Sequence, residues 1–312
     1  MPAIIVPAFG DPDVLTLADR PVREPGPGEV RVTVAAAAVN PTDLTTRSGA
    51  AAARYPDVEL PIVPGMDGAG VVDAVGPGVD RLSVGDRVMV VVQPMRPDGG
   101  TYQSSLVLPA ASAVAVPEGA SLEEAATLSR NARTAVEALA LLDLPRGATL
   151  LVTGGAGWLA TLAMPLARER GLRVIADARP DEHDAVLGHG ADEVVERGDG
   201  LVDGVRERAP DGVDGVLDAA LVGPAVFGAV RDGGGWAVVR GQDDPTERGI
   251  VRHPVWVRDR LEDTAALEHV RDLASAGVLP MTVAGRYPAA RAADAHRRQE
   301  AGGVRGRLVL TF

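Results

Sequence analysis

The stretch TGGAGWLA, residues 153–160, places glycines where an apolar run gives way to a pattern typical of a helix. The apolar run before it, residues 148–153, is expected to be a buried strand. At such a junction the first N–H groups of the helix and the positive end of its dipole can hold a phosphate, because glycines let the backbone come close. The spacing matches G-x-x-G-x-x-A and the looser G-x-G-x-x-A of dinucleotide-binding loops. The residues predicted to surround a diphosphate are Gly154, Gly155, Gly157, Trp158, Leu159 and Ala160.

Two residues do not suit this loop and its helix. Trp158 carries an indole that buries ~150–250 Å², so it must point either into a neighbouring cleft or across the path of the ligand. Pro165 stands in the middle of the expected helix, where proline removes a hydrogen bond and costs ~3 kcal/mol. We therefore expect a kink or an early helix end at Pro165.

The segment VIADARPDEH, residues 174–183, bears on which dinucleotide could bind. An NAD site carries an acid at the end of the second strand, whereas an NADP site replaces it by a small residue and supplies a cation. Ala178 falls at the place of the acid, and Arg179 and His183 could meet a 2′-phosphate. Asp177, one residue earlier, could instead be the acid. The pattern favours NADP(H) over NAD(H).

Composition limits the class of protein. The chain has 312 residues, 46% hydrophobic and 24% charged, which is typical of a globular protein. No apolar run approaches the ~20 residues of a membrane span, and the N-terminus lacks the pattern of a signal peptide, so a cytoplasmic location without membrane attachment is expected. The net charge of −12 argues against a nucleic-acid partner.

Two residue types are missing, and each absence excludes chemistry. Without cysteine there is no disulfide, thiol nucleophile or thiolate zinc site. Without lysine there is no Schiff-base lysine, no P-loop lysine and no Tyr–Lys proton-transfer pair, and all 31 basic residues are arginines.

The order of expected elements indicates two kinds of architecture. Residues 1–120 alternate short Val-rich strands with Pro/Gly turns, and residues 121–142 read as a helix that starts in a capping box, Ser121 with Glu124. From residue 148 strands and helices alternate, which predicts a doubly wound parallel sheet. The chain ends in a strand that could rejoin the first domain.

Several blocks resemble the medium-chain dehydrogenase/reductase superfamily, specifically its zinc-independent quinone oxidoreductase-like branch. They are AAVNPTD (37–43), the long block 60–88, the helical segment 121–139, the glycine loop and the closing EAGGVRGRLVLTF. The resemblance implies an α/β plus β fold: a GroES-like β-barrel domain of residues 1–120 and 265–312, with a Rossmann domain of residues 121–264 inserted. The active site would lie in the cleft between them.

The resemblance also bears on metal and reaction. Zinc-dependent relatives hold their catalytic metal with Cys, His and Cys, and the matching positions here are Asn40, Met66 and Arg130. That set does not make a zinc site, so we expect no metal. Alcohol oxidation would then lack its Lewis acid. Hydride transfer from NADPH to a quinone or an α,β-unsaturated carbonyl suits such a site better.

The resemblance implies a set of site residues. A hydrogen bond to the developing enolate oxygen would come from Asn40 or Arg130, while Asp43 would orient Asn40 or merely close the Asn-Pro-x-Asp turn. Tyr55 and Tyr102 are possible proton donors, although Tyr102 is better explained as core. The substrate cleft would include Tyr55, Met66 and Trp158, and the cofactor site would add Thr134 and Gly241 to the residues named above.

Two functions of different class remain open. The first is an NADPH-dependent reductase of a small quinone or enone, in which Trp158 narrows the substrate cleft. The second is a redox-inactive relative, a non-redox enzyme or binding protein, in which Trp158 blocks the dinucleotide site. A homodimer is expected through the edge formed by residues 234–241 and 250–257.

Overall fold

The computed structural model describes residues 1–55, 58–241 and 243–312, with the main chain alone for residue 259. The chain divides into two compact units. Unit 2 comprises Asn131–Val257 and Val278–Pro280. Unit 1 comprises Met1–Arg130, Arg258–Gly277 and Met281–Phe312.

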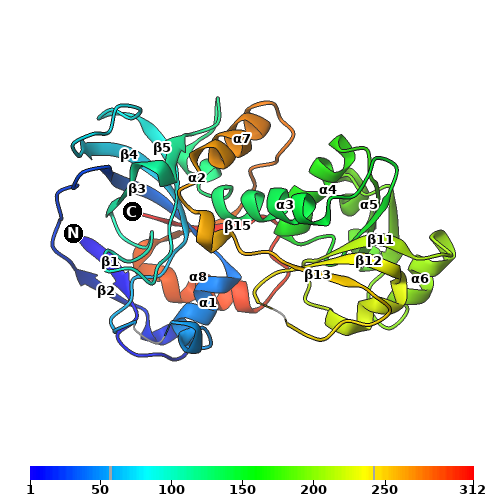
Figure 1. The fold of residues 1–312 in the computed structure, drawn as a ribbon. Coiled ribbons are helices and arrows are strands. Elements are labelled where there is room, and N and C mark those ends of the chain that lie inside the picture. The colour runs from blue at the N-terminus through cyan, green and yellow to red at the C-terminus, as the bar shows by residue number, and fades with distance from the viewer. Residues whose placement is uncertain (56–57, 242) are drawn as a thin grey trace. The chain divides into compact units, whose positions relative to one another are not determined.

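Unit 1 is built on a mixed β-sheet. Its strands follow the order β14-β15-β3-β4-β5-β7, with β6 paired to β3 and with β1 and β2 forming a separate antiparallel pair. The terminal strand β15 pairs antiparallel with β3, as expected for a chain end that returns to the first domain (Figure 1). The strands are β1 Pro2–Ile5, β2 Thr16–Asp19, β3 Glu29–Val39, β4 Asp67–Val75, β5 Arg87–Val91, β6 Ser105–Pro109, β7 Ala113–Ala115, β14 Val283–Pro288 and β15 Arg307–Thr311.

The helices of unit 1 carry clear start and stop signals. In α1, Pro41–Ser48, Asn40 is the N-cap, Pro41 supplies the first helical residue and Gly49 ends the helix in the left-handed conformation. The other helices are α2 Leu122–Ala125, α7 Thr264–Ser275 and α8 Ala292–Glu300, with 3₁₀ turns at Pro12–Val14, Ala52–Arg54, Ala110–Ser112, Val257–Arg260 and Ala289–Arg291.

The expected helix over residues 121–142 forms as two helices. Its capping box is confirmed, because Ser121 Oγ accepts from Glu124 N at 3.2 Å and Glu124 Oε2 accepts from Ser121 N at 2.8 Å. However, α2 stops at Ala125, and α3 runs separately over Ser129–Leu142. The chain leaves unit 1 after the second residue of α3, Arg130.

Unit 2 contains six parallel strands in the order β10-β9-β8-β11-β12-β13. Of these, β11, β12 and β13 are labelled in Figure 1. Counted along the unit, the strand order is 3-2-1-4-5-6, the order of the Rossmann fold, so the predicted doubly wound sheet is confirmed. The strands are β8 Thr149–Val152, β9 Arg173–Ala178, β10 Glu193–Glu196, β11 Val213–Asp218, β12 Val230–Val238 and β13 Val251–Pro254.

The helices of unit 2 pack on an apolar core. Trp236 of β12 is fully buried and meets Phe227 edge to face, with ring centroids 4.9 Å apart. Pro165 does not end its helix early, because α4 continues to Glu169. Besides the part of α3 after Arg130, the helices are α4 Trp158–Glu169, α5 His183–Gly188 and α6 Leu201–Arg208, with 3₁₀ turns at Pro180–Glu182 and Gly223–Ala229. Among the described residues, no helix has the length and apolar character needed to cross a bilayer.

Candidate functional site

The centre of unit 1 is a buried carboxylate, Asp67, at the start of β4. Its Oδ2 accepts from Asn40 Nδ2 at 2.7 Å and its Oδ1 accepts from the backbone N of Arg130 at 2.6 Å. Arg307 Nε donates to Asn40 Oδ1 at 3.1 Å. The Asn40 amide is thus oriented at both ends, by a carboxylate and a guanidinium. Burial raises the pKa of Asp67, and the bonds from Asn40 and Arg130 act against that rise.

A second buried carboxylate, Asp43, fixes the backbone beside this centre. Asp43 Oδ2 accepts from Asn40 N at 2.8 Å, and Oδ1 accepts from Gly65 N at 3.2 Å. The bond to Asn40 N closes the turn and fixes the backbone of Asn40, and the bond to Gly65 N ties this turn to the segment before β4. Complete burial raises the pKa of Asp43 to about 7, and the nearby charge of Asp67 adds to the rise.

Behind Asp43 runs a chain of buried polar side chains. Arg47 Nη1 lies 3.4 Å from His296 Nδ1, and because a guanidinium can only donate, Nδ1 accepts and Nε2 carries the hydrogen. That Nε2 lies 3.2 Å from Tyr102 Oη, which in turn lies 3.4 Å from Asp43 Oδ2. Glu300 Oε1 accepts from Arg47 Nη2 at 2.6 Å. The chain therefore donates in one direction, from Arg47 toward Asp43.

This chain explains two residues that the sequence left unassigned or ambiguous. Tyr102 is fully buried, and burial together with Asp43 raises its pKa well above the usual value, so it holds a proton for Asp43. His296 is also fully buried, and burial and the neighbouring Arg47 lower its pKa to about 3. The imidazole is therefore neutral at physiological pH.

The lowered pKa of His296 predicts a pH dependence of stability. Between about pH 3 and 6.5 the unfolded chain binds a proton that the folded protein does not, so the free energy of unfolding rises with pH over this window. From pH 3 to pH 7 the free energy of unfolding of the wild type should rise by on the order of 3–5 kcal/mol more than that of His296→Gln. Urea unfolding at several pH values measures this. Parallel curves of unfolding free energy against pH for the wild type and His296→Gln would disprove the assignment.

A separate cluster in unit 1 surrounds Tyr55. Gln93 Nε2 donates to Tyr55 Oη at 2.9 Å, and Arg258 Nη1 approaches the same oxygen at 3.4 Å. The Arg258 guanidinium also lies 5.7 Å from the centre of the Tyr55 ring. Both neighbours are donors to the hydroxyl oxygen, so among the described residues the Tyr55 O–H has no acceptor committed to it. Burial lowers the pKa of Arg130. The charges of Asp67 and Asp43 act against this decrease.

The residues at the zinc-ligand positions do not fit a zinc ion. Asn40 is committed to Asp67 and Arg307, and Arg130 is a cation. Met66 is buried, with its Sδ 3.3 Å from Thr42 Oγ1. In the part of the chain that the structure describes, no three His, Cys, Asp or Glu side chains gather in a way that could hold a metal.

The glycine loop of unit 2 folds tightly against β9. Gly154, with φ +68°, donates its N–H to Asp177 Oδ1, and Gly155 N donates to Asp177 O at 2.9 Å. A Cβ on Gly155 would lie 2.9 Å from Asp177 O and 3.0 Å from Val186 Cγ1, so this position requires glycine. Gly157 is the N-cap of α4, without a side chain to fill the site in front of the helix.

The first turn of α4 is arranged as an anion-binding helix start. In the loop, Gly157 N donates to Gly154 O at 2.7 Å, and in the first turn of α4 the N–H of Thr161 donates to Gly157 O at 2.9 Å. The amides of Leu159 and Ala160 therefore precede the intrahelical ladder and can point at a ligand. Trp158 is the first residue of α4 and only 4% exposed. The loop and helix fit a diphosphate.

Two arginines lie at the carboxyl end of β9, and each is paired with a carboxylate. Arg179 Nη2 donates to Glu182 Oε1 at 2.6 Å, so a neighbouring carboxylate already engages it. Asp177 is 1% exposed and turned into the glycine loop, with Arg197 Nε 3.6 Å from its Oδ2. Arg197 follows β10, and its N–H donates to Ala178 O at 3.0 Å. The register of β10 on β9 thus places a second arginine, Arg197, beside Ala178, which the sequence analysis did not predict.

Three further predicted residues belong to this unit. His183 begins α5 and has a buried Nε2 with no hydrogen-bond partner among the described residues. Thr134 lies on α3, and Gly241 follows β12 in a turn with φ +76°. The ends of β8 and β11 are tied by Asp218, whose Oδ1 accepts from Thr153 Oγ1 at 2.7 Å.

Comparison with known proteins agrees with this architecture. Residues 26–118 match the family described as the alcohol dehydrogenase GroES-like domain, and residues 189–310 match the zinc-binding dehydrogenase family. A solved NAD-dependent alcohol dehydrogenase is 32% identical with a TM-score of 0.88, and a mycobacterial protein complexed with NADPH is 30% identical with a TM-score of 0.86. In both cases the match covers 100% of each chain.

The chain belongs to the medium-chain dehydrogenase/reductase superfamily. Within it, the quinone oxidoreductase of Pseudomonas aeruginosa is 35% identical over 191 residues, which are 61% of this chain and 56% of that protein. The synaptic vesicle membrane protein VAT-1 homolog of Rattus norvegicus is 35% identical over 222 residues, 69% of this chain and 52% of that protein. This medium-chain dehydrogenase/reductase thus spans about half the length of these curated relatives.

Proposed function

We propose that this protein is a zinc-independent, NADPH-dependent reductase that transfers hydride to a small quinone or α,β-unsaturated carbonyl compound. The observation that carries the proposal is the tight glycine loop, with open amides at the start of α4 and two arginines after the neighbouring strands. NADPH, when bound, supplies the hydride. The mycobacterial structure with NADPH and the quinone oxidoreductase of Pseudomonas aeruginosa support the choice of cofactor and acceptor.

In this proposal the residues of unit 1 handle the acceptor. The Tyr55 O–H donates to the carbonyl oxygen as negative charge develops there, and the positive charges of Arg258 and Arg130 stabilise that charge. Asn40, first expected to touch the oxygen, instead holds Asp67, and Asp43 positions Asn40 through its backbone. Asn40 and Asp43 are therefore positioning residues here.

Arg197 is proposed to recognise the 2′-phosphate of NADPH together with Arg179 and His183. Arg197→Gln should weaken NADPH binding about tenfold or more, the effect of one lost charge-assisted contact. NADH binding should change little, because it has no 2′-phosphate. Fluorescence titration with NADPH and with NADH measures the two dissociation constants, whose ratio is compared between the variant and the wild type. Arg231→Gln is the matched control, since Arg231 pairs with Asp214 at the other end of β11; equal losses for both cofactors would contradict this role.

NADPH binding also separates the reductase from the redox-inactive alternative. Titration should quench tryptophan fluorescence with saturation, and calorimetry should give the same dissociation constant. If Trp158 blocks the site, the wild type will show no saturable signal up to millimolar NADPH, whereas Trp158→Gly will bind. That outcome would replace the reductase proposal by the alternative.

A homodimer and a cytoplasmic location stay predictions, as do the absence of nucleic-acid and membrane partners. Size-exclusion chromatography with light scattering tests the first of these directly.

A further inference from the structure

Unit 1 contains a cavity of about 300 Å³ that the proposed reaction does not use. Apolar walls come from residues 58–63 and from the loop after Gln93, with Val58, Ile62, Val63 and Met95 among the lining residues. A cavity of ~150 Å³ is enough to hold a benzene ring in a protein core. This cavity therefore has room for a ring with a polar substituent.

One wall of the cavity carries a cation with spare donors. Arg20 Nη2 donates to Pro97 O at 3.2 Å and Nη1 donates to Asp98 O at 3.3 Å. Both partners are neutral carbonyls, and a guanidinium has five N–H groups. The remaining donors of Arg20 have no acceptor in the ranges that the structure describes. They form a planar fork of the kind that binds a carboxylate through two parallel bonds.

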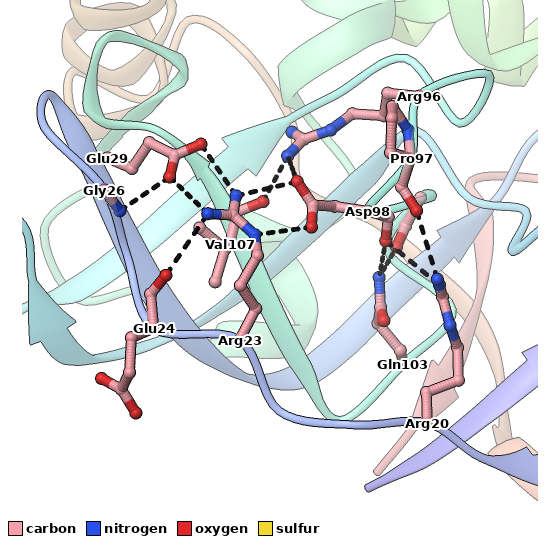
Figure 2. Close-up of polar contacts among 11 residues, drawn as sticks. Arg20, Arg23, Glu24, Gly26, Glu29, Arg96, Pro97, Asp98, Gln103 and Val107 are labelled. Carbon is pink, nitrogen blue, oxygen red and sulfur yellow. Dashed lines mark hydrogen bonds and ion pairs between the residues drawn. The ribbon is translucent and has the colours of Figure 1, made fainter.

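The wall beside Arg20 is held rigidly by its neighbours (Figure 2). The carboxylate of Asp98 accepts two bonds from Arg23, at 2.8 and 2.9 Å, and one from Arg96 at 2.7 Å. Gln103 Nε2 donates to Asp98 O at 2.8 Å. The carboxylate of Asp98 is thus engaged by two other arginines, and the loop whose carbonyls accept from Arg20 is held by contacts within the protein.

The negative charge of Glu59 beside the cavity limits the class of ligand that can bind. Glu59 lines the cavity and is exposed, and it makes no ion pair with Arg20 within 4.0 Å among the described contacts. Its negative charge repels a second anionic group. We propose that this cavity binds a small monocarboxylate with an apolar body, whose carboxylate meets Arg20 and whose body lies against Val58, Ile62 and Met95. Dianions such as phosphate esters or dicarboxylates are selected against.

Benzoate and benzamide, which share shape and differ in charge, test the proposal on the full chain. Calorimetry should show benzoate binding at least tenfold more tightly than benzamide and than sulfate. Protein labelled with ¹³C at the methionine methyl groups locates the site. Met95 lines the cavity, whereas Met66 is not among its lining residues and contacts Thr42. The Met95 signal should shift with benzoate and the Met66 signal should stay.

Variants of the lining residues complete the test. Arg20→Gln should remove the preference for benzoate over benzamide, Glu59→Gln should tighten benzoate, and Met95→Trp should abolish binding by filling the cavity. The exposed Arg54, changed to Gln, is the matched charge control and should leave the affinity unaltered. Equal affinity for benzoate and benzamide, an equal Met95 shift with sulfate, or a shift of Met66 instead of Met95 would overturn the proposal. None of these readouts depends on NADPH turnover.

Discussion

Asp67→Asn should lower the free energy of unfolding by about 3–5 kcal/mol, the cost of breaking a buried ionic arrangement by removing one partner. Both oxygens of Asp67 accept hydrogen bonds, one from Asn40 Nδ2 and one from Arg130 N. An amide in its place sets an NH₂ group against one of these donors. It also removes the negative charge that offsets Arg130 and Arg307.

Urea unfolding followed by circular dichroism measures this loss. The control is Asp73→Asn, because Asp73 accepts from Arg31 Nε at 2.7 Å but lies at the surface. That change should cost less than about 1 kcal/mol. Equal and small losses for Asp67→Asn and Asp73→Asn would show that Asp67 is not the buried anchor described above.

Tyr55→Phe should lower kcat for enone reduction by about 10²-fold, the lower end of the range for loss of a positioned acid. The hydroxyl receives bonds from Gln93 and Arg258 and has its own hydrogen left for the acceptor. Because the contact strengthens as charge develops on the oxygen, kcat should fall more than KM rises.

Steady-state kinetics with a solvent isotope effect measure the change. Tyr287→Phe is the matched control, since Tyr287 belongs to β14 and packs on the apolar core of unit 1. It should leave kcat unchanged. A Tyr55→Phe enzyme with kcat within threefold of wild type would remove Tyr55 from the reaction.

The fold could be predicted from the sequence because its signals are local. The glycine loop after an apolar strand, the alternation of strands and helices from residue 148 and the capping box at Ser121 are each contained in a short window. The break between α2 and α3 was not predicted, because tertiary packing decides it. Of the kink or early helix end expected at Pro165, the early end does not occur.

Asn40, Asp43 and Arg130 could be named as candidates from the sequence. Most of their buried contacts could not be predicted, because the partners are remote in the chain. His296 meets Arg47 across 249 residues, and Arg307 meets Asn40 across 267. No spacing rule links such positions. The position of Arg197 could not be predicted for a similar reason, since only the pairing of β10 with β9 places it beside Ala178. Arg179 was proposed from the sequence alone, but its pairing with Glu182 depends on a turn that the sequence leaves open.

The central claim is hydride transfer without a metal, and NADPH consumption by protein stripped with a chelator tests it most directly. Absorbance at 340 nm should fall with saturable dependence on a small quinone or an α,β-unsaturated ketone, and added zinc should not raise the rate. No acceptor-dependent consumption by a protein that is folded and binds NADPH, or activity that appears only when zinc is restored, would contradict the account.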